Sequence, residues 1–402
     1  MLTQRQLFLR HLAQTSDAPL GIEAVRAEGS CIWDAAGKRY IDLISGIGVS
    51  NVGHRHPEVC RAIHEQVDRY MHLMVYGEYI QYPQVQLAAR LTKLLPPTLN
   101  QVYLTNSGTE AIEGALKLAK KYTSRASTIS FQNAYHGSTQ GALSIMGHDR
   151  YRQPFAPLIP GNRVIPYNHT ESLKFIDRGT AAVVVESVQG EAGYQTPCTA
   201  WFQALRARCT EVGALLICDE IQSGIGRTGD WFGFSRHHIV PDVVTLAKGL
   251  GGGLPIGAFV ADAHHMSCLK DDPALGHITT FGGNPVCAAA ACAVLDVLEA
   301  GQLPDRAAQL EPEIRKRLEH PSVLRITGKG FMLGVDLGSN ARCQAVIADC
   351  LQNGVITDWF LFNEQSLRIA PPLNIPEELL FEACSIIRGC IARHQGSACR
   401  VT

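Results

Sequence analysis

The chain of 402 residues lacks the features that mark several large classes of protein. Its net charge is −1, so no excess of basic residues favours nucleic acid or an anionic membrane as a partner. No apolar stretch approaches the roughly 20 residues that a membrane helix needs. The first residues carry Arg5 and Arg10 but no continuous apolar core, so we expect no secretory signal there. A transit peptide is conceivable, but an amphipathic first helix is the simpler interpretation.

Cysteine motifs and nucleotide-binding motifs are also missing. The 13 cysteines include no C-x-x-C pair, and no Cys/His grouping has zinc spacing. We therefore expect reduced thiols, a cytoplasmic protein and no metal site. There is no G-x-x-x-x-G-K-[ST], which excludes a P-loop, and the glycine-rich stretch 249–257 does not fit G-x-G-x-x-G after a strand.

Apolar runs of strand length recur between segments that read as helices. Residues 101–106, 181–188, 214–221 and 242–247 are rich in Val, Ile and Leu, which is typical of buried parallel strands. Residues 200–213 fit a crossover helix. Residues 106–123 predict the clearest helix, with Ser107 and Glu110 as a capping box and one apolar stripe formed by Ile112, Ala115, Leu116 and Ala119.

The two ends of the chain differ from its middle. Residues 29–43 predict a hairpin that turns at Ala36-Gly37, and from about residue 290 helices alternate with short strands. We predict an α/β fold in which a large domain (56–285) has a mostly parallel sheet covered by helices. The N-terminal part (1–55) and the C-terminal part (286–402) together form a small α+β domain.

The predicted strand ends carry the reactive side chains. Ser107, Gly108 and Thr109 open a helix, whose N-terminus is suited to an anion, although a plain capped helix explains them equally well. Asp219 and Glu220 end the third apolar run, and Lys248 ends the fourth. A lysine, an acid and a phosphate-binding helix are the protein groups that pyridoxal phosphate requires. The alternative for Lys248 is a strand-end lysine whose amine reaches water.

Eight ordered segments decide between these interpretations. They are DAAGKRYIDLISGIGVSNVGHRHPEV, NSGTEAIEGALKLAK, AYHG, VESVQGEAGY, CDEIQSGIGRTG, LAKGLGGGLPIGA, TTFGGNPVCAAA and LRIAPPL, and they extend from about residue 29 to residue 373. In these segments the chain resembles the class III pyridoxal-phosphate aminotransferases of fold type I, in that family's order. Any one of these segments would be moderate support, whereas the complete series is strong.

The resemblance implies a role for each matching residue. Lys248 would hold the cofactor through a Schiff base and move the substrate proton, while Asp219 would pair with the pyridine nitrogen. The other implied cofactor contacts are Ser107, Gly108 and Thr109 at the phosphate, Tyr135 and His136 at the ring, Gln222 near the phenolic oxygen, and Glu186 as a supporting acid. Thr280, rather than Thr279, would reach the phosphate of a neighbouring subunit, which implies a homodimer with shared sites. Arg227 lies in a matching segment, but no physical role follows from the sequence.

Substrate contacts follow from the same resemblance. Arg368 matches the clamp for an α-carboxylate, and Glu191 matches the acid that masks this arginine in members that accept ω-amino donors. An ordinary structural ion pair is the alternative. Ser138 stands where many such members have an arginine for the donor's distal carboxylate, which weakens acetylornithine as the donor. Residues 141–161 resemble those of members that act on diamines.

The segment 74–84 is expected to line the substrate entrance. Tyr76, Glu78 and Tyr79 are the candidates there to contact a distal amine. The sequence thus predicts an aminotransferase that moves the terminal amine of an ornithine-, acetylornithine- or putrescine-like donor to 2-oxoglutarate by a ping-pong mechanism. An amine–pyruvate transaminase, an aminomutase and a racemase of the same fold are alternatives. A pyridoxal-phosphate-binding protein without turnover is the alternative outside the enzymes.

Overall fold

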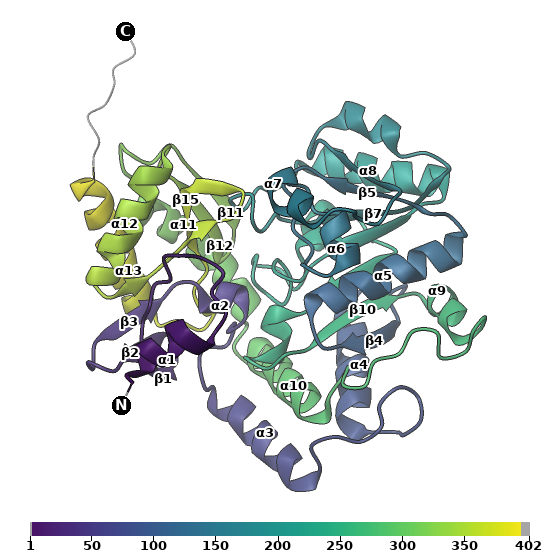
Figure 1. Cartoon of the computed structure of the whole chain (residues 1–402), viewed down its shortest axis with the longest axis horizontal. Helices are drawn as coiled ribbons and strands as arrows, with labels where there is room; N and C mark the ends of the chain where they lie inside the picture. The colour runs from purple at the N-terminus through teal and green to yellow at the C-terminus, as the bar shows by residue number, and fades with distance from the viewer. Residues whose placement is uncertain (1, 395–402) are drawn as a thin grey trace.

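The computed structural model describes residues 2–394, and the chain forms two lobes in Figure 1. The strands are β1 (Ala24–Glu28), β2 (Cys31–Asp34), β3 (Arg39–Asp42), β4 (Gln101–Thr105), β5 (Ser127–Phe131), β6 (Asn162–Ile165), β7 (Thr180–Glu186), β8 (Leu215–Asp219), β9 (Val243–Leu246), β10 (Gly257–Ala261), β11 (Arg325–Lys329), β12 (Met332–Asp336), β13 (Val355–Ile356), β14 (Trp359–Phe360) and β15 (Asn363–Ile369).

The α-helices are of very unequal length. They are α1 (Gln4–His11), α2 (Ser45–Gly48), α3 (Pro57–Arg69), α4 (Tyr82–Leu94), α5 (Gly108–Thr123), α6 (Gln140–Ser144), α7 (Asp149–Arg152), α8 (Thr199–Val212), α9 (Ala263–Ser267), α10 (Pro285–Ala300), α11 (Leu303–Leu318), α12 (Asn340–Gln352) and α13 (Glu377–Arg393). Short 3-10 turns join several of them, and one of these turns, η4 (Lys248–Gly251), follows β9 directly.

A seven-stranded sheet in the order β4-β10-β9-β8-β7-β5-β6 forms the centre of the larger lobe. Only β10 runs antiparallel to its neighbours, so the carboxyl ends of the other six strands lie along one edge. The four apolar runs of the sequence become β4, β7, β8 and β9, and the predicted mostly parallel α/β fold is confirmed. The antiparallel β10 was not foreseen.

Alternate residues of each buried strand face different helices because side chains alternate across a sheet. Ala182 and Val184 of β7 pack in one core cluster with α5, whereas Val183 and Val185 belong to the larger cluster on the opposite face. Both faces are therefore covered, which explains why these strands are continuously apolar.

Helix α5 begins with Ser107 as its N-cap, as the sequence predicts. The Ser107 hydroxyl accepts from the Glu110 N–H at 3.3 Å, but the second half of the predicted capping box is wrong. The Glu110 carboxylate accepts instead from the backbone N–H of Asn106 at 2.8 Å, one residue earlier, and from the Asn106 amide. This arrangement leaves the N–H of Ser107 and of the first helical residues directed at the sheet edge.

The smaller lobe contains both ends of the described chain. The predicted hairpin is confirmed, since β2 pairs antiparallel with β3, and β13 from the C-terminal half adds to β3 in parallel. A second sheet, β11-β12-β15-β14, lies with α11, α12 and α13 (Figure 1). The limits set at residues 55 and 285 stay a prediction.

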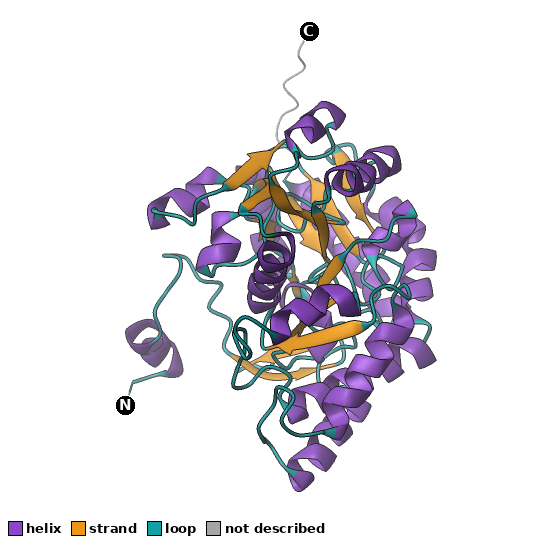
Figure 2. Ribbon diagram, turned by 90° about the vertical axis from the view of Figure 1, so that its right-hand side faces the viewer, coloured by secondary structure: helices purple, strands orange, loops and turns teal. Residues whose placement is uncertain are grey.

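Helix α1 stands apart from the rest of the chain and buries no residue (Figure 2). Leu9 is exposed, and Leu7 and Phe8 are only partly buried. Within residues 2–394, no single helix is long and apolar enough to cross a membrane, and α10 with α11, bent by 58°, passes that test only as a pair.

The approach of α5 to β10 depends on Gly114. A Cβ at Gly114 would lie 2.3 Å from the Phe259 ring, whereas a Cβ at Gly389 of α13 would meet nothing closer than 3.6 Å. We expect Gly389→Ala to stabilise the protein by about 0.5–1 kcal/mol through helix propensity. Gly114→Ala should lower the free energy of unfolding by about 1–3 kcal/mol through overpacking. Denaturant unfolding of both variants measures this, and equal effects would contradict the close approach.

Candidate active site

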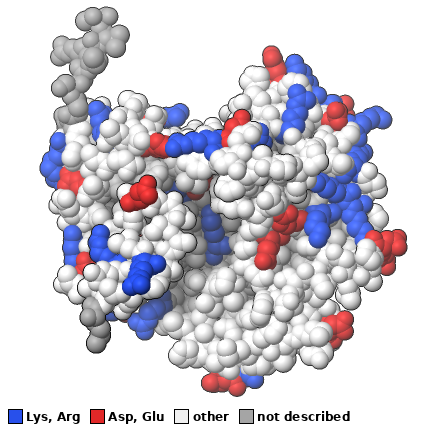
Figure 3. Space-filling view, in the orientation of Figure 1, with Lys and Arg blue, Asp and Glu red and all other residues white. Residues whose placement is uncertain are grey.

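A cavity of about 490 Å³ opens at the carboxyl edge of the large sheet. The space-filling view shows the surface hollowed between the two lobes, with a basic side chain visible inside (Figure 3). The predicted site residues that line the cavity are Ser107, Gly108, Thr109, Tyr135, His136, Glu186, Glu191, Asp219, Gln222 and Lys248. Its size falls within the range of about 300–1,000 Å³ that is typical of small-molecule sites.

Lys248 enters the cavity from the turn after β9. Its backbone φ is +45°, a left-handed conformation that is costly for a residue with a side chain and that occurs often at functional sites. Burial lowers the pKa of the Lys248 amine, the Glu191 carboxylate opposes this shift, and the Arg368 charge adds to it. Within residues 2–394, the amine makes no hydrogen bond or ion pair. It is therefore poised as a nucleophile.

Two carboxylates lie side by side at the base of the cavity. Glu186 and Asp219 are direct partners in the parallel pairing of β7 with β8, so their side chains share one face. Asp219 Oδ2 lies 2.7 Å from His136 Nδ1. Burial by itself would lower the pKa of His136, but the hydrogen bond and charge of Asp219 raise it. Asp219 is thus paired with a buried imidazole.

Glu186 supports this pair from the neighbouring strand. Its carboxylate accepts from the N–H of Tyr135 at 3.0 Å and of Gly190 at 2.6 Å. Burial raises the pKa of Glu186 to about 7, while the His136 charge opposes the shift. The acid therefore fastens the two loops that frame the cavity.

Glu220 directly follows Asp219, but its carboxylate has different contacts. Its side chain points to the other face of the sheet and accepts from the N–H of Gly233 and Phe234, each at 2.9 Å. It also accepts from the hydroxyls of Ser187 and Ser223. Glu220 therefore ties the turn after β8 together and does not line the cavity.

The N-terminus of α5 provides the anion-binding end of the cavity. Gly137 passes so close to this helix that a Cβ there, at φ +130°, would lie 2.3 Å from Thr109 Oγ1. The Thr109 hydroxyl pairs with Thr139 at 2.6 Å, and Glu113 accepts from Thr139. Backbone N–H groups, hydroxyls and the helix dipole converge here, as a phosphate requires.

Tyr135 and Gln222 border the cavity from opposite sides. The Tyr135 hydroxyl lies 3.2 Å from the hydroxyl of Ser138, which also lines the cavity. Gln222 Oε1 accepts from Arg368 Nη1 at 3.2 Å. The family resemblance implied a cofactor contact for Gln222, and its contact with Arg368 was not predicted.

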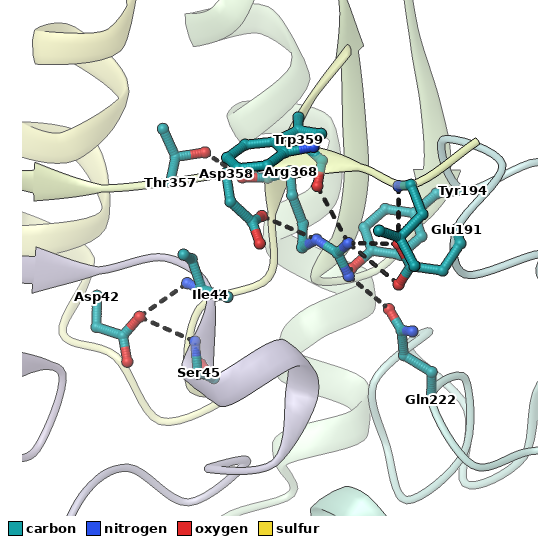
Figure 4. A network of polar contacts seen from close by, with 11 residues as sticks. Asp42, Ile44, Ser45, Glu191, Tyr194, Gln222, Thr357, Asp358, Trp359 and Arg368 are labelled. Atoms are coloured by element: carbon teal, nitrogen blue, oxygen red, sulfur yellow. Dashed lines mark hydrogen bonds and ion pairs between the residues drawn. The ribbon is translucent and has the colours of Figure 1, made fainter. Parts of the chain in front are cut away.

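Arg368 is almost fully buried at the back of the cavity, on β15 (Figure 4). Its Nη2 contacts both carboxylate oxygens of Glu191, at 3.2 and 3.0 Å. Burial would raise the pKa of Glu191, but the charges of Arg368 and Lys248 lower it below its usual range. The pair predicted from the sequence therefore forms as a close, ionised contact.

Four predicted residues do not line this cavity: Arg368, which contacts the lining residues Glu191 and Gln222, and also Thr280, Tyr76 and Glu78. Thr280 is exposed, while Thr279 accepts from the Asn106 amide at 3.1 Å. The Tyr76 hydroxyl donates to the Leu104 carbonyl, and Glu78 is exposed. Their proposed contacts with a partner subunit or a substrate stay predictions.

Arg227 obtains a role that the sequence did not indicate. This fully buried guanidinium donates to the Asn51 side chain and to the carbonyls of Phe331 and Pro371. Burial lowers its pKa to about 10. Arg227 thus joins the loop after β8 to segments of the smaller lobe, which are distant in the sequence and gave no signal.

A family model described as aminotransferase class III matches residues 12–391. This chain belongs to the class III aminotransferases. An acetylornithine aminotransferase of Methanopyrus kandleri is 40% identical over 366 residues, which cover 90% of this chain and 92% of that protein. An ornithine aminotransferase of Staphylococcus aureus is 36% identical over 378 residues, covering 90% and 92%.

A solved structure of the ornithine aminotransferase from Toxoplasma gondii, with pyridoxal phosphate at partial occupancy in its active site, superimposes with a TM-score of 0.89. It is 29% identical and covers 96% of this chain and 92% of its own. An ω-transaminase from Thermomicrobium roseum, also 29% identical, superimposes with a TM-score of 0.88 and covers 96% and 97%. The aminotransferase fold, the enzyme class and pyridoxal phosphate as cofactor are thereby confirmed.

The cavity of this aminotransferase fits that cofactor chemically. The Lys248 amine, whose pKa is lowered, would react with the aldehyde of the cofactor, and the Asp219 side chain would face its pyridine nitrogen. The N–H groups at the start of α5 would bind its phosphate.

Removing the negative charge at the base of the cavity tests this match. We expect Asp219→Asn to bind the cofactor but to lower kcat by about 10²–10³-fold, since one fixed charge that stabilises the transition state is lost. Single-turnover absorbance at the cofactor bands measures the rate. Glu220→Gln is the control: it should lower Tm and leave the rate of the folded enzyme close to the wild-type value. A fully active Asp219→Asn enzyme would contradict the assignment.

Proposed function

We propose that this aminotransferase takes an amino group from the terminal amine of an ω-amino acid or diamine and passes it to 2-oxoglutarate. The two half-reactions share one site, so the kinetics are ping-pong. The observation that carries the proposal is the contact of Glu191, which lines the cavity, with Arg368 at 3.0 Å.

While Glu191 contacts Arg368, the site favours a donor whose reacting amine has no neighbouring carboxylate. While Glu191 neutralises the guanidinium, the back of the cavity offers no unpaired cation to an α-carboxylate. A donor can therefore approach with its distal amine first. When Glu191 withdraws, the planar fork of Arg368 becomes a bidentate partner for the α-carboxylate of the oxo acid.

The cavity residues divide the remaining work. Pyridoxal phosphate supplies an aldehyde that carries the amino group and a ring that accepts electrons from the substrate carbon. Lys248 Nζ, with its lowered pKa, would take the proton from the substrate carbon and hold it in the cavity for its return. Asp219 would stabilise positive charge at the ring nitrogen, and the α5 N-terminus with Thr109 would hold the phosphate.

The distal end of the donor meets Ser138 and Tyr135. Their hydroxyls lie 3.2 Å apart and line the cavity, and neither can form an ion pair with a distal carboxylate. Arg150 is exposed and faces Glu364 at 3.4 Å. These neutral groups favour a diamine or ornithine over acetylornithine, although relatives named for acetylornithine are 40% identical. Tyr76 and Glu78 belong to the same proposal as entrance residues, and the cytoplasm remains the predicted compartment.

A homodimer completes the proposed function. Ile80 is 97% exposed and Phe281 56% exposed, on two segments that touch through the His72–Phe281 ring contact at 4.9 Å. Such an apolar surface is typical of a subunit interface. Thr280 lies on it, where it can reach the phosphate end of a neighbouring subunit's cavity.

The visible spectrum tests the donor and the acceptor directly. We expect a yellow protein whose visible absorbance, from the cofactor bound to Lys248, is bleached by glutamate and by one ω-amine. The panel contains putrescine, ornithine, acetylornithine, lysine, 4-aminobutyrate and β-alanine. Lys248→Ala is the control, and it should lose the transfer activity. If glutamate leaves the spectrum of the yellow protein unchanged, 2-oxoglutarate is the wrong acceptor and a pyruvate-using transaminase, mutase or racemase replaces the proposal.

Sedimentation of a surface variant tests the dimer. Ile80→Asp should shift the protein from dimer to monomer and weaken cofactor binding, because a charge is buried without a partner at the interface. Leu324→Asp, at a position that is 68% exposed elsewhere, is the matched control and should stay dimeric. A wild-type protein that is monomeric and fully active would rule the shared site out.

A further inference from the structure

A second carboxylate, that of Asp358, contacts Arg368 from the side opposite Glu191 (Figure 4). Strand pairing places it there: Trp359 pairs with Leu367 across the β14–β15 hairpin, and the Arg368 N–H donates to the Asp358 carbonyl at 2.8 Å. Asp358 Oδ1 then lies 2.9 Å from Arg368 Nε. The acid and the arginine are thus held by one hairpin.

The partners of the guanidinium divide into two groups. Glu191 on Nη2 and Gln222 on Nη1 both line the cavity. Asp358 on Nε, the Tyr194 hydroxyl on Nη1 at 3.5 Å and the Trp359 carbonyl on Nη2 at 3.3 Å do not line it. An incoming carboxylate can therefore replace Glu191 and Gln222 on the guanidinium while Asp358 keeps its contact with Nε.

The two acids that contact Arg368 belong to different parts of the fold. Glu191 lies on the loop after β7 of the large sheet, together with Tyr194, whereas Asp358 directly precedes β14, which pairs with the β15 strand that carries Arg368. A shift of the loops that withdraws Glu191 leaves the Asp358 contact unchanged. The guanidinium would otherwise become a buried cation without a counter-charge, free to turn about its side-chain bonds.

Asp358 is negatively charged, as a counter-charge for Arg368 must be. Burial raises its pKa to about 6, and the Arg368 charge opposes that shift, so the carboxylate is ionised at neutral pH. The Asp42 carboxylate on β3 does not compete for the guanidinium, because its Oδ1 accepts from the N–H groups of Ile44 and Ser45 at 2.8 and 2.9 Å.

We propose that Asp358 is a positioning residue for the oxo-acid half-reaction: it holds Arg368 through Nε so that both Nη groups stay aimed at the cavity when Glu191 withdraws. The inference builds on the proposed function, in which Glu191 and an α-carboxylate alternate on Arg368. Asp358 itself touches neither substrate nor cofactor.

The two half-reactions of the holoenzyme, followed separately by stopped-flow absorbance, test this role. In Asp358→Asn the concentration of 2-oxoglutarate for half-maximal rate should rise about tenfold or more, since the fork loses its fixed charge partner. The rate and half-saturation of the donor half-reaction should stay within about twofold, because Glu191 still covers Arg368 there. Asp358→Glu, which keeps the charge, should restore most of the 2-oxoglutarate affinity.

Asp336→Asn is the matched control, since Asp336 pairs with Arg325 at 3.1 Å on a strand of the same sheet. Asp336→Asn should lower Tm and should change the two half-reactions to the same extent. Equal losses in both half-reactions of Asp358→Asn, or no loss in either, would overturn the proposal. If the Asn variant does not fold, Asp358→Glu is tested instead. Its concentration of 2-oxoglutarate for half-maximal rate should then rise by less than about tenfold, while the donor half-reaction stays unchanged.

The wild-type enzyme separates failure of this inference from failure of the proposed function. If the wild-type enzyme reacts with pyruvate but not with 2-oxoglutarate, the proposed acceptor is wrong. The same comparison of half-reactions is then made with pyruvate, whose α-carboxylate requires the same fork. A selective loss there still supports Asp358 as the positioning residue, and an equal loss still rejects it.

Discussion

The contacts of the buried Arg368 guanidinium join segments of the two lobes. A buried cation is tolerated only when it is paired and its N–H groups are satisfied. Here the pairing groups come from the loops after β7 and β8 and from the β14–β15 hairpin, so satisfying one charge draws three distant segments together. The cavity lies where these segments meet, since Glu191 and Gln222 both line it and contact Arg368.

Sheet topology supplies the rest of the site. Because β4, β5, β7, β8 and β9 all end at one edge, an anion-binding helix, an aromatic loop, two acids and a lysine arrive at the same place. The left-handed backbone at Lys248 is the local cost of turning sharply after β9, and it brings the amine into the cavity. Burial then lowers the pKa of that amine, so the fold both places and activates it.

Local patterns were sufficient for much of the fold. The continuous apolar runs predicted β4, β7, β8 and β9, and the cap at Ser107 predicted the start of α5, because strand burial and helix capping are short-range properties. The second bond of the capping box was wrong, since the Glu110 carboxylate could reach Asn106 equally well. The antiparallel β10 was missed because strand direction depends on neighbours that are not adjacent in sequence.

By itself, the sequence determined the chemistry: a lysine after an apolar strand, acids at the end of its neighbour, hydroxyls at a helix start, and ordered segments that resemble one aminotransferase family. Only the tertiary structure decided that Asp219 is paired with His136 while Glu220 bonds the turn after β8, and that Arg368 has Asp358 on one side and Glu191 on the other. The physical reason is that contacts across a sheet or between lobes depend on register and on the relative position of distant segments. A pattern read along one stretch of chain carries no such information.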